Sequence, residues 1–239
     1  MREKLTPYLR RQAEEKPSIA SQYITSELEN VINWSPFLDP LEEDTHEVVK
    51  GLVHKYENRA LIKASLRCAA HCRFCTRYRQ IGSTEGDLEK ENIANIGNYI
   101  KSHPEIDDVI LSGGDPLYTP KTTIDLLKSL IEIDSVKVFR VDTRLPVHNP
   151  QSFSTPLLKK VVDVIDDIGK DRPFFLLLHF EHPDELTEET LRVVKMLRSK
   201  NATLLSQSVF LKGVNNSVET LERLFKGLYH NGVIPILHI

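Results

Sequence analysis

The sequence predicts an α/β protein built on a parallel sheet that is curved or closed into a barrel. Two observations carry this prediction. Six short apolar runs recur from about residue 60 onward, at residues 60–66, 108–112, 136–141, 174–178, 204–211 and 233–239. Amphipathic segments with helical spacing lie between these runs. Six strands separated by five helices form a βαβ series, which favours a parallel sheet with helices on its outside.

The first part of the chain has a different character. Residues 1–52 contain polar helical stretches and the only tryptophan, Trp34, and they are interrupted by prolines. We therefore expect two parts: an N-terminal, mostly helical extension over 1–52, and the main domain over 53–239.

Several helix starts can be predicted individually. Thr119-Pro120 and Thr155-Pro156 each precede an apolar segment of helical period. Threonine can cap a helix and proline suits its first turn, so helices should begin at both places. Asn216, followed three residues later by Glu219, predicts a capping box at the start of the last helix.

Composition and charge exclude several classes of protein. The chain of 239 residues has 31 Lys+Arg against 34 Asp+Glu, so it has no excess of basic residues and nucleic acid is not an expected partner. No apolar run approaches the roughly 20 residues that a membrane helix needs. Only three cysteines are present, all within residues 68–75, which rules out a disulfide framework and favours a reducing cytoplasm.

Polar residues follow the predicted strands at one end. Catalytic groups of βα barrels gather at the C-terminal ends of the strands, so these residues should share one rim. Along the chain they are residues 68–75, residues 112–116, Asp142-Thr143-Arg144 and residues 179–182; Gln207 lies within the fifth predicted strand and His238 near the end of the sixth.

The cysteine spacing is compatible with two kinds of metal site. Iron–sulfur clusters normally take four cysteines, whereas catalytic zinc takes three protein ligands and keeps one open position. A four-iron cluster held by three cysteines would leave one iron open to a substrate or cofactor. A structural zinc site would need His71 or His182 as its fourth ligand. Spacing alone leaves both open.

Two neighbouring motifs could bind small molecules. The pair Gly113-Gly114 after a buried strand would let the polar end of a ligand approach the backbone, and Asp115 could accept a hydrogen bond from an ammonium group; the same residues are also common in turns. Arg77 and Arg79 could bind a carboxylate or lie on the solvated surface.

Several motifs together resemble a known family. Cys68-x-x-x-Cys72-x-x-Cys75 resembles the radical S-adenosylmethionine (SAM) signature. The sequence resembles the lysine 2,3-aminomutase family more closely, from Asp39 to the last residue. The similar strings are Cys72-Arg73-Phe74-Cys75-Thr76-Arg77-Tyr78-Arg79, Leu111-Ser112-Gly113-Gly114-Asp115-Pro116-Leu117, Arg144-x-Pro146-Val147, His179-Phe180-x-His182-Pro183 and Gln207-Ser208-Val209. The block from His54 to Leu61 is similar to the bacterial branch that makes β-lysine for elongation factor P.

This resemblance implies a partial (β/α)6 radical-SAM barrel that holds a [4Fe-4S] cluster, SAM and pyridoxal 5′-phosphate (PLP). The implied activity moves the amino group of an L-amino acid, lysine first of all, from carbon 2 to carbon 3. It would proceed through a 5′-deoxyadenosyl radical and a PLP imine. The implied partners are the amino acid substrate and a reducing electron donor such as flavodoxin or ferredoxin, and the chain could form a homo-oligomer.

The resemblance also assigns residues by position. Cys68, Cys72 and Cys75 would bind the cluster, and Arg77 would bind the substrate carboxylate. The residues implied to contact SAM are Gly113, Gly114, Asp115, His179 and Gln207. Those implied to contact PLP are Lys55, Tyr56 and Arg59. Two positions depart from the family pattern. Ser206 stands where the family usually has Asn, and Asp142 occupies a position that is Gly- or His-like in the family.

The family's PLP lysine lies after the sixth strand, so no lysine of this chain can be matched to it. Because the chain ends at Ile239, on an apolar strand, we expect a C-terminally truncated copy. Two alternatives stay open: a radical SAM enzyme acting on another amino acid, such as glutamate or arginine, and a zinc-stabilised binding protein without catalysis.

Overall fold

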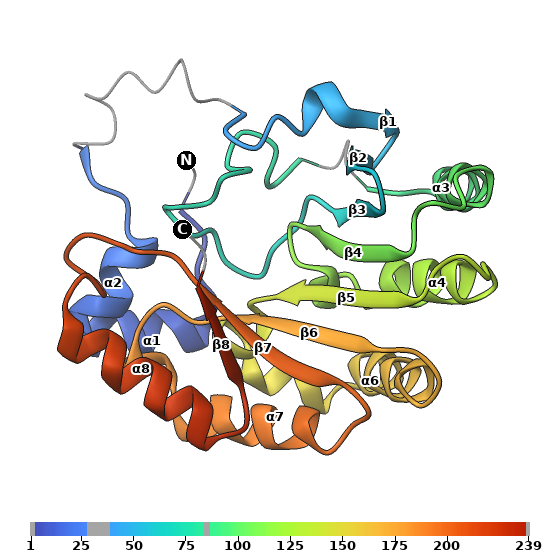
Figure 1. Cartoon of the computed structure of the whole chain (residues 1–239). Helices are drawn as coiled ribbons and strands as arrows, with labels where there is room; N and C mark the ends of the chain where they lie inside the picture. Colours follow the sequence, from blue (N-terminus) through green and yellow to red (C-terminus); the bar gives the residue numbers. More distant parts are fainter. Residues whose placement is uncertain (1–2, 28–38, 84–86, 238–239) are drawn as a thin grey trace.

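One mixed sheet organises the chain. The computed structural model describes residues 3–27, 39–83 and 87–237. Its eight strands lie side by side in chain order, with β1 and β8 at the open edges (Figure 1). The sheet is parallel from β3 to β8, and β1, β2 and β3 pair antiparallel. The strands are β1 (Glu47–Val49), β2 (Leu52–Tyr56), β3 (Arg59–Ser65), β4 (Asp108–Gly113), β5 (Val138–Thr143), β6 (Phe174–His179), β7 (Thr203–Ser208) and β8 (Ile234–Leu237).

The fold-class prediction is confirmed, because the six predicted strands correspond to β3–β8 and the sheet does not close. Five crossover helices connect these strands. They lie on the outside of the curved sheet, which forms an open arc (Figure 1). They are α3 (Lys90–Ser102), α4 (Pro120–Ile131), α6 (Pro156–Gly169), α7 (Glu188–Arg198) and α8 (Val218–His230). Among the described residues, no helix is long and apolar enough to cross a membrane.

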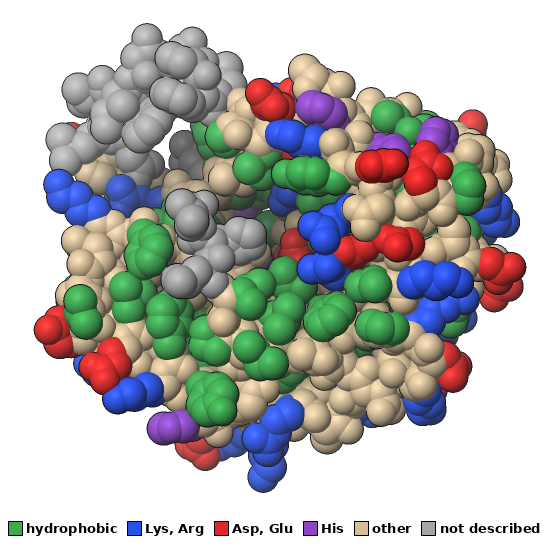
Figure 2. Space-filling view, viewed as in Figure 1, with side chains coloured by type: hydrophobic (Ala, Val, Ile, Leu, Met, Phe, Trp, Pro, Cys, Tyr) green, Lys and Arg blue, Asp and Glu red, His purple; other side chains and the backbone are tan. Residues whose placement is uncertain are grey.

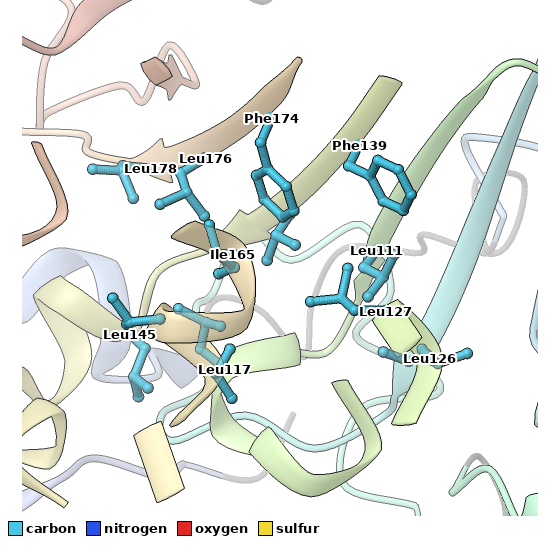
Figure 3. Close-up of a cluster of buried hydrophobic side chains, with 14 of the residues drawn as sticks. Leu111, Leu117, Leu126, Leu127, Phe139, Leu145, Ile165, Phe174, Leu176 and Leu178 are labelled. Atoms are coloured by element: carbon cyan, nitrogen blue, oxygen red, sulfur yellow. The ribbon is translucent and has the colours of Figure 1, made fainter. Parts of the chain in front are cut away.

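The core lies between the sheet and these helices (Figure 3). Along β4, Val109 and Leu111 belong to the core, so Asp108, Ile110 and Ser112 face the inside of the arc. The stacked rings of Phe139 and Phe174, 6.0 Å apart, join β5 to β6. Burying each such side chain contributes about 1.5–3 kcal/mol.

Two strands were not predicted. β1 has three residues and β2 carries the polar His54 and Lys55, so neither has the apolar run of the parallel strands. They form an antiparallel extension of the sheet on the β3 side. The division at residue 52 stays a prediction.

The N-terminal segment forms two helices, α1 (Pro7–Glu15) and α2 (Pro17–Tyr23). Tyr8, Leu9 and Tyr23 belong to a second buried cluster, which also contains Ala70 of the segment that follows β3. These two helices therefore pack on the segment that follows β3. Trp34 lies outside the described residues.

The helix starts are partly as predicted. Thr119 and Thr155 occupy the N-cap positions of α4 and α6, but neither side chain makes a capping bond. The capping prediction at Asn216 is wrong by one residue. Ser217 Oγ accepts the hydrogen bond from the Thr220 N–H at 3.2 Å, because the Asn216 side chain already accepts from Gly213 N at 2.8 Å in the preceding turn.

Candidate functional site

The loop after β3 carries all three cysteines, and the end of β4 holds it. The backbone N–H of Gly114 donates to the Ser65 carbonyl at 2.6 Å, and that of Asp115 donates to the Arg67 carbonyl at 2.9 Å. These bonds fix the chain immediately before Cys68 against the neighbouring strand. Cys68, Cys72 and Cys75 are free thiols and partly buried.

The glycine pair is required by this contact. Gly113 has φ +108°, and a Cβ there would lie 2.4 Å from the Ser65 carbonyl oxygen. A Cβ on Gly114 would lie 2.3 Å from the Arg67 carbonyl oxygen. The polar group that approaches these glycines is thus the protein's own backbone, and their contact with SAM stays a prediction.

Asp115 connects the same loop to β5. Its carboxylate accepts from Thr143 Oγ1 at 2.8 Å and from the backbone N–H groups of Leu117 and Arg144 at 3.0 and 2.9 Å. Burial raises its pKa to about 6, and these hydrogen bonds oppose the rise. All three of these donors belong to the protein, so the side chain positions the rim. Its role toward SAM stays a prediction.

Burial raises the pKa of all three thiols. The pKa of Cys72 rises to about 11, although the Arg144 guanidinium opposes the rise. The pKa of Cys68 is raised further by Asp115 and the other two cysteines, and Lys4 opposes this rise. The rise in the pKa of Cys75 is opposed by a hydrogen bond from the Arg77 backbone N–H. A bound metal centre would have to displace these protons.

The donor set suits an iron–sulfur cluster by its chemistry. The three thiols are on one loop. Cys72 and Cys75 add to the rise in the pKa of Cys68 that burial causes, and Cys75 adds to that of Cys72. Within the described ranges, however, no three His, Cys, Asp or Glu side chains converge closely enough to hold a metal ion. The loop therefore supplies the ligands, and at least one of the three thiols would have to change its position for them to share a common centre.

The N-terminal extension lies against this loop. Lys4 Nζ donates to the Cys68 carbonyl at 2.6 Å, and the Lys4 carbonyl accepts from His71 N at 3.0 Å. The Gln22 carbonyl accepts from Arg73 N at 2.9 Å. Sequence reasoning missed this contribution, since no spacing in the first 23 residues connects them with the cysteines.

Arg77 is already paired within the protein. Its Nε and one terminal nitrogen donate to the two Glu43 carboxylate oxygens at 2.8 and 2.6 Å. The other terminal nitrogen faces Ser112 Oγ at 3.3 Å and the Gly113 carbonyl at 3.2 Å. Glu43 raises the pKa of Arg77 although burial lowers it. A substrate carboxylate would share or replace Glu43 on this guanidinium.

The remaining predicted SAM residues lie further along the rim. His179 is the last residue of β6 and Gln207 the last but one of β7. The two are direct partners in the sheet register and half-buried on its inner face. Asp142 lies on the same face of β5, and burial raises its pKa to about 6. No described residue donates a hydrogen bond to its Oδ1. His238 lies outside the described residues.

The residues predicted for PLP lie elsewhere. Arg59 starts β3 and pairs with Asp108 at 2.8 Å, Lys55 pairs with Glu42 at 3.1 Å, and Tyr56 is 62% exposed. The cysteine loop leaves the other end of β3 after Ser65, six residues from Arg59 and so about 20 Å along the strand at 3.3 Å per residue. The strand thus separates Arg59 from the cysteine loop, and the PLP role of the three residues stays a prediction.

Comparison with known proteins decides the family. The model of the radical SAM superfamily matches residues 62–225. The chain belongs to the radical SAM superfamily. This membership implies a [4Fe-4S] cluster and SAM, and it favours iron over zinc for the three cysteines.

Individual relatives narrow the similarity within the superfamily. The chain is 37% identical to L-lysine 2,3-aminomutase of Clostridium subterminale over 82% of its length and 46% of the relative. It is 38% identical to L-lysine 2,3-aminomutase of Escherichia coli, covering 91% of this chain and 62% of that one. It is 35% identical to L-lysine 2,3-aminomutase of Haemophilus influenzae, over 91% of this chain and 63% of that one. The chain thus spans about half to two thirds of the length of these relatives.

Proposed function

We propose that this chain is a radical SAM aminomutase that moves the amino group of L-lysine from carbon 2 to carbon 3. The observation that carries the proposal is the cysteine loop. Three free thiols lie on one rim loop that both the end of β4 and the N-terminal extension hold in place. The chain has only three cysteines, so a four-iron cluster held by them keeps one iron for SAM.

Cys68, Cys72 and Cys75 would hold the cluster. When bound, the cluster and SAM supply the radical chemistry that removes a hydrogen atom from the substrate, with the electron coming from a donor such as flavodoxin or ferredoxin. Gly113, Gly114 and Asp115 hold the cysteine loop against β4 and would place the SAM amino group. In this structure the N–H groups of Gly114 and Asp115 and the Asp115 carboxylate all have partners within the protein.

The other residues would orient the reactants. His179 and Gln207 present polar side chains from adjacent strands toward the inside of the arc and would contact SAM. Arg77 would bind the substrate carboxylate, because its guanidinium is held at the end of β4 by Ser112 and Gly113 and already binds one carboxylate, that of Glu43. Lys55, Tyr56 and Arg59 would contact PLP only if that cofactor reached the opposite end of β3.

The test is product analysis under anaerobic conditions. The protein is reconstituted with iron and sulfide and incubated with SAM, dithionite, PLP and, separately, L-lysine, L-glutamate and L-arginine. We expect β-lysine from lysine, detected by liquid chromatography and mass spectrometry. A β-amino acid formed only from glutamate, or only from arginine, would show that this amino acid and not lysine is the substrate. Cleavage of SAM without any β-amino acid would refute the aminomutase, and a protein that binds only zinc would refute radical chemistry.

A further inference from the structure

Arg144 lies at the centre of a buried polar cluster that the proposed roles leave unexplained. It follows β5, and only 6% of the residue is exposed. One terminal nitrogen of its guanidinium donates to Cys72 Sγ at 3.1 Å. The other donates to Glu185 Oε1 at 2.7 Å and to the Gln22 side-chain oxygen. A cysteine assigned to the cluster, the N-terminal extension and the loop after β6 therefore meet on one guanidinium.

The guanidinium is held on several sides. Its carbon lies 5.3 Å from the ring centre of Tyr23 and 4.9 Å from that of Phe74, a cation–π geometry at both. The Glu185 side chain is fully buried, and its second oxygen accepts from the Glu181 backbone N–H at 2.7 Å. A planar fork fixed in this way cannot swing with its sulfur partner, so the position of the N–H group is set by the protein.

This geometry has a consequence for a cluster bound through Cys72. One-electron reduction adds a negative charge to the cluster, and that charge is shared by the ligand sulfurs. Hydrogen bonds to ligand sulfurs and nearby positive charge favour the reduced state and raise the reduction potential. Arg144 provides both at one sulfur, in a site from which water is largely excluded.

We propose that Arg144 is a positioning residue that fixes the Cys72 sulfur and stabilises the reduced cluster, and that helix α2 keeps it in place through Gln22. The inference rests on the proposed function only in that the three cysteines hold a cluster. It assigns a role to the Arg144-x-Pro146-Val147 motif and makes the N-terminal extension part of the redox site.

The test is a potentiometric titration of the anaerobically reconstituted full chain, followed by electron paramagnetic resonance of the reduced cluster. We expect Arg144→Gln to lower the ratio of reduced to oxidised cluster at a fixed potential at least tenfold, which is a 59 mV shift for one electron. Arg144→Lys and Gln22→Ala should shift it the same way by less. Arg140→Gln is the matched control: Arg140 lies on β5, the strand that Arg144 follows, and binds Asp108 at the start of β4.

The outcomes separate this inference from the proposed function. An Arg144→Gln protein that loads its cluster and keeps the wild-type potential overturns the role of Arg144. If Arg144→Gln does not load a cluster, Arg144→Lys and Gln22→Ala decide, and wild-type potentials in both overturn it. A wild-type protein that forms no [4Fe-4S] cluster refutes the proposed function and this inference together.

Discussion

Replacing Glu181 by glutamine should change how the stability of the fold depends on pH. Glu181 follows β6 and is fully buried; its Oε2 accepts from Val209 N at 2.6 Å, and its carbonyl accepts from the Asn215 side chain at 2.8 Å. No partner for its Oε1 is found among the described residues. Burial raises the pKa of this carboxyl from 4.5 to about 7, and Arg144 opposes the rise.

The sign and size of the effect follow from this shift. Between pH 4.5 and 7 the folded protein keeps a proton that the unfolded chain releases, so the free energy of unfolding falls as the pH rises through this window. The pKa difference between 4.5 and about 7, at 1.36 kcal/mol per pKa unit, lowers the free energy of unfolding above pH 7 by about 3 kcal/mol relative to its value at low pH. Glutamine carries no charge at any of these pH values and avoids this cost.

Urea unfolding of the reduced apoprotein between pH 4.5 and 8 measures the effect. The free energy of unfolding of Glu181→Gln, relative to the wild type, should increase by about 3 kcal/mol across the window. Glu188→Gln is the control, since Glu188 lies on the surface of α7 with an 80% exposed side chain. A difference for Glu181→Gln that is as independent of pH as that of the control would refute the reasoning.

Three further substitutions test other parts of the structure. Gly114→Ala would place its Cβ 2.3 Å from the Arg67 carbonyl oxygen, so the cysteine loop must move; alkylation of the thiols should become faster, and an unchanged rate would contradict the contact. Glu43→Ala leaves the guanidinium of Arg77 buried without its carboxylate and should cost about 3–5 kcal/mol in urea unfolding, whereas a loss below 1 kcal/mol would show that the pair is not buried in solution. Phe139→Ala should cost about 3–5 kcal/mol by the same measurement, and a near-neutral result would contradict its place in the core.

The parallel part of the fold could be predicted because its signals are local. Each strand of β3–β8 is a short apolar run and each crossover helix has an apolar face of period 3.6, so no distant contact is needed to recognise them. β1 and β2 were missed because three residues and a polar hairpin carry no such pattern. They are stabilised by pairing with β3, which is a tertiary property.

The site was predicted in its location and less so in its contacts. Parallel strands bring their C-terminal ends to one edge, so the cysteines, Gly113-Gly114 and His179 could be placed on one rim from their order alone. The pairing of Arg77 with Glu43 and of Arg144 with Cys72 joins residues 34 and 72 positions apart, and no periodicity encodes it. The resemblance marked these arginines without showing what holds them.

The central claim is that this chain cleaves SAM at a cluster held by Cys68, Cys72 and Cys75. The most direct measurement is the amount of 5′-deoxyadenosine formed when the anaerobically reconstituted protein is mixed with dithionite and SAM, in parallel with Cys75→Ala. We expect 5′-deoxyadenosine from the wild-type protein and none above background from the variant. Absence of 5′-deoxyadenosine from a wild-type protein with a full [4Fe-4S] cluster, or equal amounts from Cys75→Ala, would contradict the claim.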